Sequence, residues 1–174
     1  MLSPNSGFPP ADNLPSQKTI VALCRAAGYE CTGIPLYSKP SGPIIAWVRY
    51  GPNVTMPAAF TQDWVAKYLE ANPAGGVLVP RVFMASTDDN PNCTIGYIVM
   101  QYIDAVVCDT GDVELVAAAV QTLISVPAPS DAPGPVGGGP IIHNFFVDWT
   151  SAITYESVEE LQQHINGVIS ALIF

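Results

Sequence analysis

The sequence predicts an α+β fold, in which one helix packs across a small antiparallel sheet and a partial helical region follows. Two pairs of extended runs predict the sheet, one near residues 30–37 and 43–50 and the other near 77–86 and 94–103. A helical pattern over 57–71 separates the two pairs. The order hairpin, helix, hairpin is typical of a small α+β lobe, because a helix with one apolar side buries it against a sheet face.

Turn chemistry and a capping residue support the first hairpin and the helix after it. Lys39-Pro40-Ser41-Gly42 supplies the residue types that favour a tight turn between the first two extended runs. Thr55 is placed to cap the helix, with Pro57 in its first turn. The second hairpin is expected to turn through the polar residues 87–92. The helix is expected to bury the apolar residues that recur at helical spacing, Phe60, Trp64, Val65, Tyr68 and Leu69.

A short helix is expected ahead of the sheet, over residues 17–27. Ser16 is a favourable capping residue for its start, and Gly28 is a favourable stop. Residues 1–15 are rich in Pro, Asn and Ser and are expected to form a loose lead-in. The helix is expected to bury Ile20, Val21, Leu23 and Cys24.

The region after the second hairpin is predicted to be partly helical. A helix is expected over 112–126, then a Pro/Gly connector over 127–140 and a short extended run over 141–149. Ser157-Val158-Glu159-Glu160 is a capping-box pattern that opens a final helix. The last residues, 171–174, are apolar and include neither a glycine nor a cation, which predicts that this helix continues further or docks on a partner. Its apolar side is expected to be Val158, Leu161, Ile165, Val168, Ile169 and Leu172.

Composition and charge exclude several classes of partner. The net charge is −9, and the chain has only six Lys and Arg residues. This balance argues against nucleic acid, whose binding requires clustered cations, and against an anionic membrane surface. The N-terminus lacks the basic and apolar regions of a signal peptide, and no apolar run is long enough to span a bilayer. A cytoplasmic protein is therefore predicted.

The cysteines and histidines do not predict a metal site. None of the four cysteines forms a CxxC pair, and the two histidines lie far apart in the sequence. Buried free thiols are the preferred interpretation of the cysteines. A hydrogen-bonded structural role is favoured for His143, because no G-x-S-x-G elbow presents a nucleophile beside it. His164 is expected to be exposed on the final helix.

The Gly-rich residues 133–140 invite a phosphate-loop interpretation but lack its chemistry. A P-loop places Lys and then Ser or Thr directly after its glycines, whereas Pro140 and Ile141 follow here. A turn-rich connector is the better interpretation of this stretch.

The most informative segment is the strand-to-hinge segment, residues 96–104. An apolar strand ends there in Met100-Gln101-Tyr102-Ile103-Asp104, a polar and aromatic step whose backbone groups are placed to receive an adenine ring. The strand at 44–51 and the helix at 57–71 precede it, which is the element order by which kinase-like phosphotransferases present a phosphate-binding Lys and its Glu partner.

Several blocks of sequence together resemble one protein family. They are Trp47-Val48-Arg49-Tyr50-Gly51 with Asn53-Val54-Thr55, Thr61-Gln62, Val79-Pro80-Arg81-Val82, the strand-to-hinge segment, and Pro133 to Gly139 with His143-Asn144-Phe145-Phe146. Over residues 40–170 the chain is similar to fungal proteins of the aminoglycoside-phosphotransferase, protein-kinase-like superfamily. The resemblance implies a loose segment at 1–15, a kinase-like N-terminal lobe at 16–104, and at 105–174 a helix, the connector and the start of an incomplete C-terminal lobe.

The resemblance implies a set of nucleotide-binding positions. Arg49 stands where the family has its strand lysine, which preserves charge but not phosphate geometry. The position of the family's acidic residue near the start of the helix corresponds to Ala58, which cannot form an ion pair. Gln101 stands where the family commonly has a hinge Glu. The backbone groups of Gln101, Tyr102 and Ile103 remain available to adenine. ATP is the implied ligand, with its binding weakened or lost.

The catalytic machinery implied by the family is not matched. The sequence has no His-x-Asp loop followed by a metal-binding Asn, so neither catalytic nor metal-binding residues are assigned and Mg²⁺ is not expected to bind. One hypothesis is a catalytically incomplete nucleotide lobe, from a truncated gene model or a degraded paralogue. The alternative hypothesis is a non-catalytic regulatory pseudokinase module that docks a protein partner through the apolar C-terminal helix.

Overall fold

The structure, a computed structural model, describes residues 8, 13–28, 30–31, 33–73, 76–90 and 93–172, without the side chains at 89, 90, 93, 147 and 169–172. The chain forms two compact units, Met1–Val126 and Pro127–Phe174. The first unit is α+β, as predicted, with a four-stranded antiparallel sheet. The lead-in predicted at 1–15 lies almost wholly outside the described residues. The predicted boundaries at 15/16 and 104/105 stay predictions.

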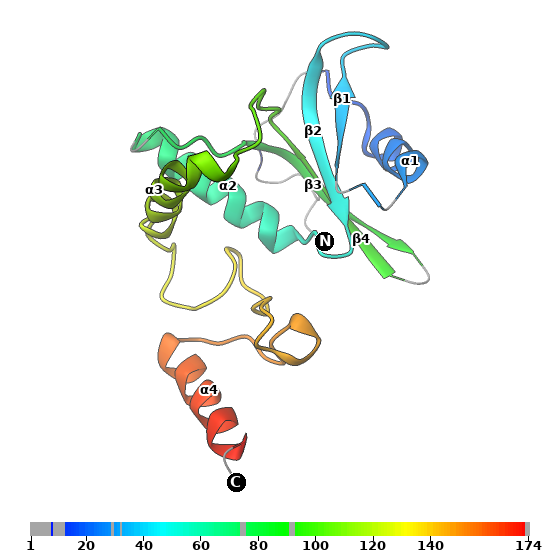
Figure 1. Ribbon diagram of the computed structural model, residues 1–174. Coiled ribbons are helices and arrows are strands. Elements are labelled where there is room, and N and C mark those ends of the chain that lie inside the picture. The colour runs from blue at the N-terminus through cyan, green and yellow to red at the C-terminus, as the bar shows by residue number, and fades with distance from the viewer. Residues whose placement is uncertain are drawn as a thin grey trace. The chain divides into compact units, whose positions relative to one another are not determined.

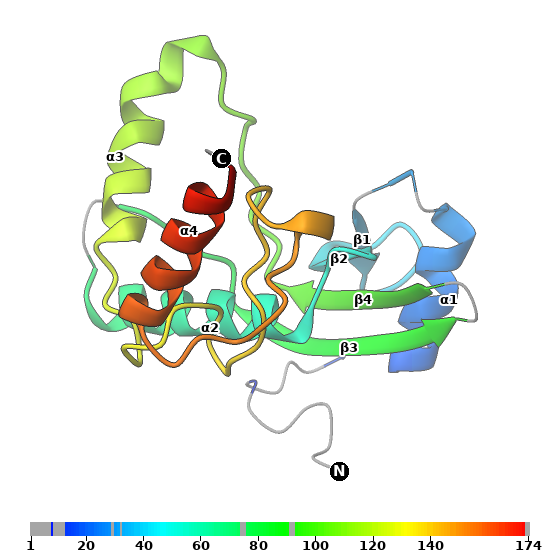
Figure 2. The ribbon, with the colours of Figure 1, turned by 90° about the horizontal axis from the view of Figure 1, so that it is seen from below.

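The sheet has the strand order β1-β2-β4-β3 (Figure 1). The first hairpin is β1 (Gly33–Tyr37) with β2 (Ile44–Gly51), and the second is β3 (Val82–Asn90) with β4 (Cys93–Met100). β2 and β4 pair in the middle, with Arg49 opposite Ile98 and Trp47 opposite Met100. Figure 2 shows β3 and β4 lying side by side. Both hairpins follow the sequence-based prediction.

Helices cover the two faces of this sheet. α1 (Gln17–Ala27) buries Ile20 and Cys24 against one face, where Val48, Tyr50 and Val99 lie. The Tyr50 hydroxyl donates to the Gly28 carbonyl at 2.6 Å and so attaches β2 to the end of α1. α2 (Met56–Ala71) lies on the other face, over a core of Val54, Ala59, Val82, Ala85, Ile98 and Met100 (Figure 1).

The predicted helix caps are present. The Ser16 hydroxyl accepts from the Thr19 amide at 3.3 Å, and α1 ends at Gly28, whose φ of 84° favours glycine. The Thr55 hydroxyl accepts from the Ala58 amide at 3.2 Å at the start of α2. Leu23 is a correction: it was expected to be buried on α1 but is 44 % exposed.

The buried side of α2 also differs from the prediction. Its buried residues are Ala59, Asp63, Ala66 and Leu69, whereas Phe60 is exposed and the other large apolar residues are half-buried. Small side chains lie against the sheet because they allow the helix to approach the strands closely, and the aromatic rings spread along the flanks. Gln62 fixes this position by donating to the Pro80 carbonyl at 2.8 Å.

The second hairpin is longer at its tip and shorter at its base than expected. Residues 87–90 belong to β3 rather than to the turn, and 91–92 lie outside the described residues. At the base, 77–81 and 101–103 are not strand. After β4 the chain runs irregularly to a 3-10 turn, η1 (Thr110–Asp112), and to α3 (Val113–Ile124), which buries none of its residues.

The second unit contains a second 3-10 turn, η2 (Val147–Trp149), and α4 (Val158–Leu172). The extended run predicted over 141–149 is instead a compact turn, closed by a bridge between Ile142 and Thr150. The capping-box pattern is formed with one change: Ser157 accepts from the Glu160 amide, but Glu160 accepts from the Glu156 amide at 2.8 Å. None of the helices in the described residues has the length and apolarity needed to cross a membrane.

Candidate functional site

The strand-to-hinge segment leaves the sheet at the end of β4. The Gln101 amide still donates to the Arg81 carbonyl at 2.8 Å, which is the last backbone bond between the two strands of the hairpin. Within the described part of the chain, the backbone amide and carbonyl groups of Tyr102 and Ile103 take part in no hydrogen bond. Both residues are half-buried. A short length of backbone with open donors and acceptors therefore follows the central strand.

Arg49 lies on β2 opposite Ile98 and is exposed. Alternation along the strand places Arg49 on the same sheet face as Trp47, two residues away. Among the described residues, no carboxylate forms an ion pair with Arg49. Its guanidinium is therefore available to an anionic group that approaches this face.

An aromatic pair connects β2, which holds Arg49, with the strand-to-hinge segment. The rings of Trp47 and Tyr102 are stacked, with centroids 6.5 Å apart and an interplanar angle of 27°. The other edge of the indole lies against β1, since a Cβ at Gly33 would meet Trp47 Cε2 at 2.8 Å. The predicted site residues Arg49 and Tyr102 thus share one face of the sheet, with an indole ring between them.

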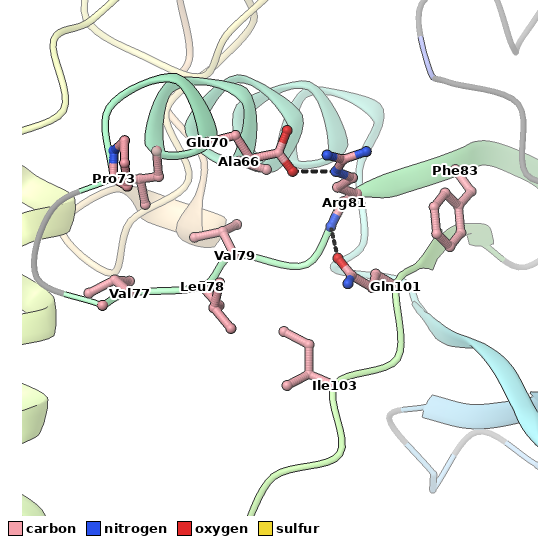
Figure 3. Close-up of a pocket in the computed structure, with 12 residues that line it drawn as sticks. Ala66, Glu70, Pro73, Val77, Leu78, Val79, Arg81, Phe83, Gln101 and Ile103 are labelled. Atoms are coloured by element: carbon pink, nitrogen blue, oxygen red, sulfur yellow. Dashed lines mark hydrogen bonds and ion pairs between the residues drawn. The ribbon is translucent and has the colours of Figure 1, made fainter.

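Gln101 and Ile103 line a different feature, a cleft of about 610 Å³ (Figure 3). Its other walls are the C-terminal half of α2 and the irregular segment before β3. In the close-up, Leu78 and Ile103 project into the open space, Val79 points toward α2, and Gln101 lies beside Arg81. The structure therefore divides the predicted residues 101–103 between two surfaces.

Asp63 is a buried carboxylate that the sequence analysis missed. It lies in the stripe by which α2 faces the sheet, and its partner is Lys67, with Nζ to Oδ2 at 2.6 Å. The expected acidic position, Ala58, is half-buried, packs against the core beneath α2 and donates the capped amide. The signal for Asp63 was its spacing from Ala59 and Ala66, a carboxylate inside a stripe of small residues.

The histidines of the second unit are structural. His143 Nδ1 accepts from the Phe145 amide at 3.1 Å. His164 is half-buried rather than exposed, which corrects the prediction, because its Nδ1 lies 2.9 Å from the hydroxyl of the buried Tyr155. Ser151 is also occupied: its hydroxyl accepts from the Ile141 amide and donates to the Ile153 carbonyl.

The Gly-rich stretch forms a turn, and the described thiols are not all buried. Gly137 and Gly138 have positive φ, and the Gly138 amide donates to the Pro135 carbonyl, as in a turn. Cys24 is buried, but Cys31 and Cys108 are exposed, so the expectation of buried thiols is wrong for those two. Over the described ranges, no group of three His, Cys, Asp or Glu side chains is arranged to hold a metal ion.

Comparison with models of protein families, with curated proteins and with solved structures gives no match to this chain.

Proposed function

We propose that the first unit is a kinase-like nucleotide lobe, related to aminoglycoside phosphotransferases, that binds an adenine nucleotide weakly and transfers no phosphate through these residues. The observation that carries the proposal is the open backbone at Tyr102 and Ile103, which directly follows β4, the strand paired with the β2 strand that holds Arg49. Adenine would take the backbone groups, and the phosphates would lie toward Arg49.

The order of the elements supports the same proposal. A strand with a cation is followed by a helix with a buried carboxylate, and then by a hairpin that leads to the open backbone. Kinase-like phosphotransferases arrange their lysine strand and glutamate helix in this order. Here Asp63 is the carboxylate on the sheet side of the helix.

Four departures from that arrangement argue for weak binding without catalysis. Arg49 replaces the lysine, and Asp63 pairs with Lys67 of its own helix instead of a strand cation. No His-x-Asp loop follows in these 174 residues. The Trp47 ring is stacked on Tyr102 next to the backbone that adenine would use, so the ring has to move or serve as a stacking platform.

The proposal is tested by titrating the protein with ATP and with adenosine while amide resonances of residues 101–104 are followed by NMR. We expect both ligands to shift these resonances at millimolar concentration. Arg49→Gln should weaken ATP binding and leave adenosine unaffected, because only ATP carries phosphates. Lys18→Gln, which removes an exposed cation on α1, is the matched control. Unchanged spectra with both ligands would contradict the proposal.

Trp47→Ala gives a second test of the same site. Removal of the indole uncovers Tyr102 and the backbone beside it, so adenosine should bind more tightly than to the unsubstituted protein if Trp47 blocks the site. If Trp47 is the stacking platform, the affinity should fall instead. An unchanged affinity would place adenosine elsewhere and count against the proposed position.

A second proposal is a non-catalytic module that docks a protein partner through α4. The favouring observation is that Val158 is 61 % exposed and Val168 is 36 % exposed on this helix. Isolated exposed apolar residues are ordinary, whereas a contiguous apolar patch on this helix would mark an interface. A monomer in light scattering that captures no protein, and that behaves identically after Val158→Glu, would contradict it.

A further inference from the structure

The cleft beside Gln101 and Ile103 borders the proposed nucleotide position and shares Ile103 with it. Its volume of about 610 Å³ is in the range of small-molecule sites, roughly 300–1,000 Å³. Tyr102, whose ring stacks on Trp47, is not among the residues that line it. Arg49 and Tyr102 thus belong to the proposed nucleotide position alone, whereas Ile103 borders both.

The walls of the cleft are mostly aliphatic. Leu69, Val77 and Val79 line one part of it, and Phe83 and Ile103 line another. Leu78 is 78 % exposed and projects into the open space of the cleft in Figure 3. An aliphatic chain bound here would remove both its own surface and that of Leu78 from water, at about 25 cal/mol per Å².

The polar groups of the cleft are concentrated at Arg81. Its Nε donates to a carboxylate oxygen of Glu70, and its backbone amide donates to Gln101 Oε1 at 3.5 Å. The two terminal guanidinium nitrogens and Gln101 Nε2 make no hydrogen bond to a side chain in the described part of the chain. The uncommitted groups are thus mainly donors, and they require an acceptor from the ligand.

We propose that this cleft binds a small carboxylic acid with a linear apolar chain, the carboxylate at Arg81 and Gln101 and the chain along Leu78 and Ile103. A carboxylate suits a guanidinium because it accepts two parallel N–H bonds. Glu70 already binds the Arg81 guanidinium and carries the same negative charge as the ligand. The Arg81–Glu70 ion pair therefore lowers the affinity for the ligand's carboxylate.

The test uses sodium octanoate with the full 174-residue protein, and follows amide resonances around Leu78 and Ile103 by NMR. Octanoate should shift these resonances in a saturable way. Butanoate should bind more weakly, by about fourfold for each buried methylene that it lacks. Octanol should bind about two- to fivefold more weakly than octanoate, the range of an exposed charge pair.

Two substitutions with opposite expected effects make the test specific. Arg81→Gln should lower the octanoate affinity to that of octanol, whereas Glu70→Gln should raise it, because the guanidinium loses its competing carboxylate. Both residues are about half exposed, so neither change is expected to unfold the protein. Arg25→Gln, which breaks the other Arg–carboxylate pair of the sheet, is the matched control and should leave the affinity unchanged.

Equal affinity for octanoate and octanol, or equal affinity of the Arg81→Gln and Glu70→Gln variants, would overturn the assignment of the carboxylate. No saturable shift near Leu78 with any of these ligands would overturn the site. A result of either kind leaves the nucleotide proposal intact, since that proposal is measured with ATP and adenosine and is tested through Arg49, which does not line the cleft.

Discussion

Gly96 shows how one residue can determine the geometry of the first unit. It lies on β4 opposite Gly51, where the turn between β2 and α2 passes close to the strand. A Cβ at Gly96 would meet the Val54 carbonyl carbon at 2.6 Å and its oxygen closer still. The backbone of this turn therefore packs directly on the strand that leads to residues 101–104.

Gly96→Ala is expected to destabilise the first unit by about 3 kcal/mol, at the upper end of the usual cost of overpacking, because the obstacle is backbone and cannot rotate away. Urea unfolding followed by circular dichroism measures the change. Gly167→Ala is the matched control: a Cβ there meets nothing within 4 Å inside α4, and alanine should be neutral or stabilising. Equal stability of the Gly96→Ala and parent proteins would contradict the close packing.

Cys24 makes a pH-dependent contribution to the free energy of unfolding. The thiol is fully buried, and desolvation raises its pKa from 9.0 to about 11. The folded state keeps the proton to higher pH than the unfolded chain, so this contribution is fully present below pH 9.0 and is lost as the pH rises toward 11. The loss amounts to about 2–3 kcal/mol.

The measurement for Cys24 is the free energy of unfolding at a series of pH values from neutral to 11, for the parent and for Cys24→Ala. The variant is less stable at neutral pH because it has a cavity, but its stability should fall less above pH 9.0. The exposed Cys31 and Cys108 should react with a thiol reagent well before Cys24. Parallel pH curves for the two proteins would contradict the raised pKa.

At the scale of elements, α2 depends on its cap. The Thr55 hydroxyl satisfies the Ala58 amide at the point where the chain enters the helix beneath the sheet. Thr55→Ala should lower the stability of the first unit by about 1 kcal/mol, whereas Thr55→Ser retains the oxygen and should cost less than half of that. Urea unfolding compares the two variants, and equal losses would show that the methyl group matters rather than the cap.

The elements differ in how far the sequence predicts them. Strong local signals, such as the caps at Ser16 and Thr55 and the turn after Tyr37, place α1, α2 and the first hairpin correctly, whereas the second hairpin differs at its tip and base. On α2 the helical spacing places Leu69 correctly and Phe60 wrongly, because spacing identifies an apolar stripe but not how closely the helix approaches the sheet. Close approach selects Ala59 and Ala66 over Phe60.

In the candidate site too, features that depend on local sequence can be predicted, whereas features that depend on tertiary packing cannot. The polar residues that follow the apolar strand could be predicted, although β4 ends at Met100 and not at residue 103 as expected. The stacking of Trp47 on Tyr102 could not, because it depends on the pairing of β2 with β4. The burial of Asp63 likewise depends on tertiary packing.

At the scale of the whole molecule, the two compact units differ in the size of their cores. In the first unit both sheet faces are covered by helices and carry buried aliphatic clusters. In the second unit, Ser151 and Tyr155 are the buried residues among the described side chains. Stability increases with the apolar surface that folding buries, so the second unit should be the less stable of the two.

This difference predicts two transitions in urea, the second unit unfolding first. Amide resonances of Ile98 and Tyr155 report on the two units separately by NMR. Tyr155→Phe removes the hydroxyl that lies 2.9 Å from His164 Nδ1. It should lower the free energy of unfolding reported at residue 155 by about 1 kcal/mol and leave that reported at Ile98 unchanged. Gly96→Ala should have the opposite pattern. Simultaneous loss of both resonances in every variant would show a single cooperative unit, since one transition cannot be shifted without the other.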